Sequence, residues 1–146
     1  MQPKGNAMKR WTAVFLVWVS VIAFSQDSIS VALQRLATID VFAFGPVGFG
    51  ATTSEGEIYF KAIMSLPPAK AINLLEKLYV EGNPQSKSYA LAGLRKLKRG
   101  RFEQLRISLR DSDVRVEMLS GCIGSEQSLS EVANDLESGK YDAWIR

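Results

Sequence analysis

The residues that could support acid–base chemistry gather at one point of this chain. Glu55 and Glu57 flank Gly56 directly after Ser54. Paired carboxylates in a pocket can serve as a general acid and a general base. The same residues also have capping-box spacing, and carboxylates in the first turn of a helix are stabilised by the helix dipole. We therefore expect Ser54, Glu55 and Glu57 to begin a helix, and a carboxylate-based enzyme near Ser54–Glu57 is the alternative.

Composition removes most other catalytic chemistry. The chain of 146 residues contains no histidine and a single cysteine, Cys122. Histidine-based triads, histidine general bases and histidine-containing zinc sites are therefore excluded, as is an intramolecular disulfide. We expect Cys122, on an apolar stripe, to be buried and structural. No phosphate loop, dinucleotide fingerprint or metal-ligand spacing is present, so we predict no cofactor, no metal site and no enzymatic activity.

An apolar segment rich in glycine precedes the carboxylates, at residues 39–50. Pro46 and three glycines prevent a regular helix there. Its apolar side chains need cover, and we expect the segment to plug an open end of the helical core. The alternative is a wall of a ligand or partner groove. The candidate partner contacts in this segment are Phe42, Phe44, Val47 and Phe49.

Apolar residues at helical spacing predict most of the remaining elements. Pro68 and Pro84 suit the first turn of a helix, whereas Gly82 and Gly139 suit positions just past a helix end. Ser128 and Glu131 have the spacing of a second capping box. The predicted helices cover residues 27–38, 55–65, 68–80, 84–98, 101–110 and about 129–138.

The segment 113–124 fits two structures. Val114, Val116 and Met118 alternate as in a strand, whereas Val114, Met118 and Cys122 also align at helical spacing. An internal comparison decides for a helix over 112–123. Residues 83–94 and 111–122 correspond at a shift of 28 residues, as expected for a helical hairpin used twice.

Two resemblances bear on the fold and the function. The turn Asp111-Ser112-Asp113-Val114-Arg115 and the apolar positions around it resemble a HEAT-type helical repeat. That resemblance implies an all-α fold, a short stack of antiparallel hairpins that presents a binding surface. The run 44–50, with Tyr89-Ala90-Leu91-Ala92-Gly93-Leu94 and Gly121-Cys122-Ile123, resembles a group of small exported bacterial proteins of unassigned function. It implies no catalytic residue.

The N-terminal residues have the order of an export signal. Basic residues up to Arg10 precede an uncharged apolar stretch, 11–24, and Ala23-Phe24-Ser25 offers a small-residue cleavage site. At about 1.5 Å per residue the stretch would span roughly 21 Å, short of a bilayer core of about 30 Å. We expect cleavage after Ser25 and a periplasmic or secreted protein. The alternative is a membrane anchor formed by residues 11–24.

The predicted organisation has three parts. A signal peptide occupies residues 1–25, a helix and the apolar loop occupy 26–52, and a helical-hairpin domain occupies 53–146. The formal charge of +3 is carried by the signal, so the mature chain is neutral and nucleic acid is not an expected partner.

Basic residues cluster at 95–110, called here the basic block, and acidic residues predominate in the C-terminal part that follows. We expect the two to offset each other across a solvated face, and the alternative is an anionic partner, either a protein or an envelope surface. The sequence thus predicts an exported, non-enzymatic binding or structural module, or a membrane-tethered form of it. The candidate contacts in the block are Arg95, Lys98, Arg99 and Arg101.

Overall fold

The computed structural model describes residues 27–145. The chain divides into two compact units between Val31 and Ala32, and the described residues from 32 onward belong to the second unit. The first described residues, 27–37, are helical, which confirms the helix predicted there. The predicted signal peptide and its apolar stretch lie outside the described residues.

Five further helices follow at the places where capping residues and periodicity predicted them. Ser54 accepts a hydrogen bond from the Glu57 backbone N–H at the start of α2, and Asn83 accepts one from Ser86 at the start of α4. Ser128 and Glu131 form the complete capping box of α6. The bounds are α2 Glu55–Met64, α3 Pro68–Glu81, α4 Pro84–Leu97, α5 Arg99–Ser108 and α6 Leu129–Glu137.

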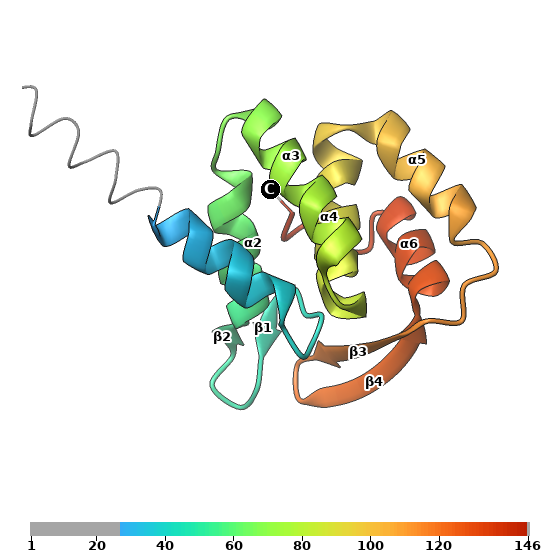
Figure 1. Ribbon diagram of the computed structural model, residues 1–146. Coiled ribbons are helices and arrows are strands. Elements are labelled where there is room, and N and C mark those ends of the chain that lie inside the picture. Colours follow the sequence, from blue (N-terminus) through green and yellow to red (C-terminus); the bar gives the residue numbers. More distant parts are fainter. Residues whose placement is uncertain (1–26, 146) are drawn as a thin grey trace, which may run out of the picture. The chain divides into compact units, whose positions relative to one another are not determined.

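Helix α4 is the central element of the fold, and the other helices pack around it (Figure 1). It contacts α2, α3, α5, α6 and β3, and a continuous run of its residues from Ser88 to Leu94 is buried. Gly93 allows close packing with α3, because a Cβ there would come within 2.6 Å of the Leu75 side chain. Burial of this helix on several sides explains its run of small and apolar residues from Ala90 to Leu94.

Two antiparallel strand pairs complete the structure. The short pair joins β1 Pro46–Val47 to β2 Thr52–Thr53, inside the segment that Pro46 and the glycines keep from being helical. The longer pair joins β3 Arg115–Ser120 to β4 Ile123–Ser128, with Val116 opposite Gln127 and Met118 opposite Ser125.

The predicted helix over 112–123 is therefore wrong. Gly121, at a φ of +58°, forms the turn between the strands together with Cys122. The alternation of Val116 and Met118 is that of a strand with one covered face, because Val116 is fully buried and its neighbours Arg115 and Glu117 are exposed. The fold is mostly helical, with a β-hairpin in place of the second helical hairpin.

No helix within residues 27–145 has both the length and the apolar character needed to cross a bilayer.

Candidate functional site

The glycine-rich segment is anchored to the core at its first half. Tyr89 on α4 accepts a hydrogen bond from the Ala43 N–H at 2.9 Å and donates one to the Ala43 carbonyl at 2.8 Å. Burial raises the pKa of Tyr89 to about 12, so its hydroxyl keeps its proton at neutral pH. Gly56 makes room for it, since a Cβ there would lie 2.3 Å from the hydroxyl oxygen.

Aromatic rings surround this anchor. Phe42 meets Phe44, Tyr89 and Tyr141 edge to face, with centroid separations of 5.3, 4.8 and 5.5 Å. Phe44 also packs on Phe60 of α2. Offset and edge-to-face pairs at these separations add to the free energy gained by burial. Phe42 and Phe44 therefore belong to the core, as the plug interpretation of the loop predicted.

The two neighbouring carboxylates, Glu55 and Glu57, differ in burial. Glu57 is buried; it accepts a hydrogen bond from the Gly45 N–H at 2.8 Å and forms an ion pair with Lys61 at 2.5 Å. Ser54 donates to the Ala43 carbonyl at 2.9 Å, while Glu55 is exposed. Ser54 and Glu57 thus hold the backbone of the loop, and the two carboxylates do not converge on a pocket.

The second half of the segment forms an exposed tip. Val47 is partly buried and bridges to Gly121, whose carbonyl accepts a hydrogen bond from the Gly48 N–H at 2.9 Å. Phe49 is fully exposed, and so it is not a plug residue. Cys122 is also exposed beside this tip, which contradicts the prediction that it is buried; it lies in a hairpin turn and not on the apolar side of a helix.

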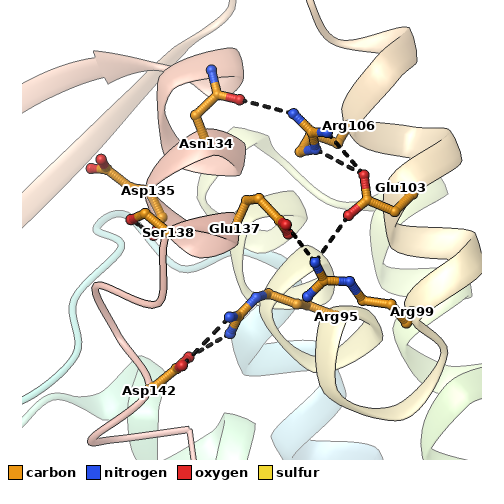
Figure 2. Close-up of polar contacts among 9 residues, drawn as sticks. All are labelled: Arg95, Arg99, Glu103, Arg106, Asn134, Asp135, Glu137, Ser138 and Asp142. Carbon is orange, nitrogen blue, oxygen red and sulfur yellow. Dashed lines mark hydrogen bonds and ion pairs between the residues drawn. The ribbon is translucent and has the colours of Figure 1, made fainter.

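The four predicted basic contacts all have acidic partners, some of which appear in Figure 2. Arg95 pairs with Asp142, and Arg99 pairs with Glu103 on its own helix and with Glu137 on α6. Hydrogen bonds and charge from Arg95 hold the pKa of Asp142 below its usual range. This arrangement joins the basic block to the acidic C-terminal third, as the offset interpretation predicted. Lys98 and Arg101 lie 2.9 and 3.9 Å from Glu76.

A cavity lies between the β3–β4 hairpin and the C-terminal segment, beside the anchored loop. Its volume is about 190 Å³. Met118, Ser120, Ser125 and Gln127 share one face of the hairpin with the buried Val116, because side chains two apart on a strand point the same way. Lys140, Tyr141 and Trp144 supply the opposite wall, and Phe42 to Phe44 and Leu119 complete the lining.

The residues that line the pocket differ in burial and polarity. Phe42, Phe44 and Tyr141 are buried, whereas Ser120, Ser125 and Lys140 are exposed. Trp144 packs against the backbone of Gly45, where a Cβ would come within 2.8 Å of the indole. The pocket lining therefore combines buried aromatic residues with exposed polar ones, and Phe42 to Phe44 of the anchored loop belong to it.

One polar atom in this lining lacks a partner. Gln127 Oε1 is buried without a hydrogen-bond partner in the described part of the chain. Lys140, by contrast, is engaged: its Nζ lies 2.5 Å from Asp135, a bond that raises the pKa of Lys140. A buried acceptor without a partner costs free energy.

The sequence indicated only the floor of this pocket. The sequence predicts a role for Phe42 and Phe44, but it favours a helix where the hairpin wall stands and gives no signal for the C-terminal wall. The strand alternation of Val114, Val116 and Met118 was the one available signal for the hairpin. No sequence signal indicates the contact between Gly45 and Trp144, because the two residues are far apart in the sequence.

Comparison with protein-family models, with curated proteins and with solved structures finds no match to this chain. No group of three or more histidine, cysteine, aspartate or glutamate residues within 27–145 is arranged to hold a metal ion.

Proposed function

We propose that this protein is a non-enzymatic binding module whose helices hold a preformed pocket for one apolar group. The observation that carries the proposal is the 190 Å³ pocket with aromatic walls between the hairpin and the C-terminal segment. A cavity of about 150 Å³ lined by apolar side chains is large enough to bind benzene. The pocket thus fits one ring or a fused pair of rings.

The contacts of the loop anchor support a preformed site. Tyr89 and Glu57 together bind backbone groups of Ala43, which lines the pocket, and of Gly45, which follows the lining residue Phe44. Binding to a pocket that is already ordered avoids the entropic cost of ordering it. The same contacts support a non-enzymatic role, because the serine and the buried carboxylate are occupied with the backbone.

Export is a separate part of the proposal. The basic start, the apolar stretch at 11–24 and the resemblance to small exported bacterial proteins support it. A form tethered by residues 11–24 is the alternative, and the intact mass of the protein recovered from cells separates the two. Loss of residues 1–25 supports export of the free module, whereas their retention supports the tether.

A second candidate contact is the exposed tip at Phe49, which would meet a protein partner. The supporting observation is the full exposure of this aromatic side chain. Binding of an acidic protein or of anionic lipid by the basic block is a weaker candidate, since its arginines and lysines already have carboxylate partners.

The pocket can be tested with small apolar probes and a matched pair of variants. We expect indole or benzothiophene to shift the NMR signals of the Met118 methyl group and of the Trp144 ring in the full-length protein. Ser125→Phe places a ring on the pocket face of β4 and should abolish these shifts. Glu126→Phe places the same ring on the opposite face and should preserve them.

Two results would contradict the proposal. The first is that neither probe perturbs Met118 or Trp144 at millimolar concentration. The second is that Ser125→Phe and Glu126→Phe, both folded by circular dichroism, leave probe binding equally intact.

A further inference from the structure

The outer strand of the β3–β4 hairpin has an open backbone edge. Strand β3 is covered on its other side, where Phe42 donates to the Glu117 carbonyl at 2.8 Å and accepts from the Leu119 N–H at 3.1 Å. Strand β4 has no such neighbour among residues 27–145; it lies on the outer side of the hairpin (Figure 1), and its residues 123–126 are exposed. An uncovered edge is a template on which another extended chain can pair.

The strand register identifies the backbone groups of β4 that point outward. Along an antiparallel pair, residues whose backbone groups bond across the ladder alternate with residues whose groups point away from it. The bonds to Phe42 show that Glu117 and Leu119 point away from β4. Their partners in the register, Glu126 and Gly124, therefore point away from β3. The N–H and C=O groups of these two residues have no hydrogen-bond partner within residues 27–145, so the edge offers two donors and two acceptors.

Strand β4 lacks the features that usually protect an edge. Edge strands commonly carry lysine or proline, or are bent away by a bulge. The sequence of β4, Ile-Gly-Ser-Glu-Gln-Ser, contains neither residue, and all six of its positions pair with β3 in a regular register. Its one charged side chain, Glu126, is paired with Arg115 at 3.1 Å. The edge is therefore open to pairing.

The same edge leads to the pocket. Ser125 is opposite Met118 in the register, and both residues line the pocket on the same face of the hairpin. Ser125 is small and exposed, so it leaves room beside it. A residue of an added strand that stood opposite Ser125 would have its Cβ about 5 Å away on this face, a distance over which aromatic side chains reach across strands.

We propose that β4 accepts an extended segment of another polypeptide as a third strand, and that one aromatic side chain of this segment enters the pocket. This inference rests on the proposed function. The residues on either side of the aromatic one bond to Gly124 and Glu126, and the aromatic residue stands beside Ser125. Strand addition of this kind takes its affinity from backbone hydrogen bonds and its specificity from pockets for alternate side chains. Strand β4 has no aromatic residue, so a second copy paired through β4 would leave the pocket without a ring.

The peptide Thr-Thr-Trp-Thr-Thr, blocked at both ends, is a direct probe. Threonine favours strands, and tryptophan supplies the ring. By calorimetry, we expect the full-length protein to bind this peptide about tenfold more tightly than a blocked single tryptophan, because only the peptide can bond to the edge. N-methylation of the two threonines next to tryptophan removes the N–H groups that face β4 and should abolish this gain. N-methylation of the tryptophan, whose N–H points away from β4, is the matched control and should preserve the gain.

A pair of variants tests the edge from the side of the protein. Gly124→Pro removes an outward N–H and leaves the bonds to β3 in place, since proline is tolerated where the N–H of an edge strand faces solvent. It should abolish the gain, while indole, which needs only the pocket, still binds. Gly124→Ala keeps the N–H, and its Cβ would meet no atom within 4 Å, so it should retain the gain.

Failure of this inference differs from failure of the proposed function. If indole binds but the peptide binds no more tightly than the blocked tryptophan, the edge does not accept a strand and the pocket remains a binding site. Equal binding of the two N-methylated peptides would also overturn the inference, whether or not Gly124→Pro folds. A dimer that forms without peptide and dissociates in a folded Gly124→Pro variant would assign the edge to a second copy instead. If indole, the blocked tryptophan and the peptide all fail to bind, both proposals fail.

Discussion

Phe42 and Phe49 belong to the same glycine-rich segment, yet Phe42 is completely buried and Phe49 is fully exposed. The difference follows from what each half of the segment meets. The first half bonds to Tyr89, Glu57 and strand β3, where Phe42 donates to the Glu117 carbonyl at 2.8 Å. The second half contacts its own short strand β2 and the hairpin near Gly121.

Hydrophobic composition therefore did not decide burial within this segment. Backbone groups of the first half find partners in the core, so its aromatic rings are held there. A tip that turns back on itself at Gly48 pairs with its own short strand and with the next hairpin turn. Phe49 at that tip thus has no surrounding side chains to cover it.

Among the variants that test this difference between the two halves, Phe42→Ala should lower the stability most. Removing a fully buried ring that contacts Phe44, Tyr89 and Tyr141 should lower the free energy of unfolding by about 3–5 kcal/mol. Denaturant titration followed by circular dichroism measures the change. A loss below about 1 kcal/mol would show that the first half of the segment is not part of the core.

Tyr89→Phe tests the anchor without removing its ring. The Ala43 N–H loses its buried acceptor, so we expect a loss of about 1–3 kcal/mol. Tyr59→Phe is the matched control, because the Tyr59 hydroxyl makes no hydrogen bond to any residue between 27 and 145, and it should cost little. Equal stability of the two variants would contradict the anchor.

The anchor also predicts a pH dependence. The pKa of Tyr89 is raised to about 12 in the folded protein, above the ordinary value of about 10 in the unfolded chain. Its contribution is therefore complete below pH 10 and is lost as the pH rises from 10 toward 12. Between pH 10 and 12 the free energy of unfolding should fall less for Tyr89→Phe than for the unmodified protein. Parallel plots of unfolding free energy against pH for the two proteins would argue against a buried neutral hydroxyl.

The smallest effect is expected for Phe49→Ala. A side chain that is fully exposed contributes little to folding, so the free energy of unfolding should change by no more than about 0.5 kcal/mol. Comparing the melting temperatures of Phe49→Ala and Phe42→Ala measures this difference in stability. Strong destabilisation by Phe49→Ala would mean that the tip is covered in solution.

The helices were predictable because their signals are local. Pro68, Asn83 and Ser128 act within a turn of the helices that they begin, and the structure places helix starts there. Residues 112–123 were not, since their apolar pattern suits either a strand or a helix. The choice depends on pairing with residues 123–128 and on the bond from Phe42, which is distant in the sequence.

Prediction of the candidate site failed for the same reason. Ser54 and Glu57 were recognised as a helix start, and Ser54 does cap α2, but the Glu57 side chain binds Gly45 instead of completing the capping box. The pocket needs Gln127 and Trp144 to meet the loop at Phe44. Neither residue has a sequence neighbour that indicates this meeting.

By itself, the sequence determined approximately where each of the helices lies, although it also predicted one at 112–123 that does not form, and it determined that histidine chemistry is missing. Caps, prolines and glycines act over a few residues, and the absence of histidine holds for any fold. Only the tertiary structure decided that Glu57 is buried, that Phe49 is exposed and that Gln127 faces an aromatic pocket. Burial depends on which distant segments pack against a residue, and that is settled by the free energy of the whole fold.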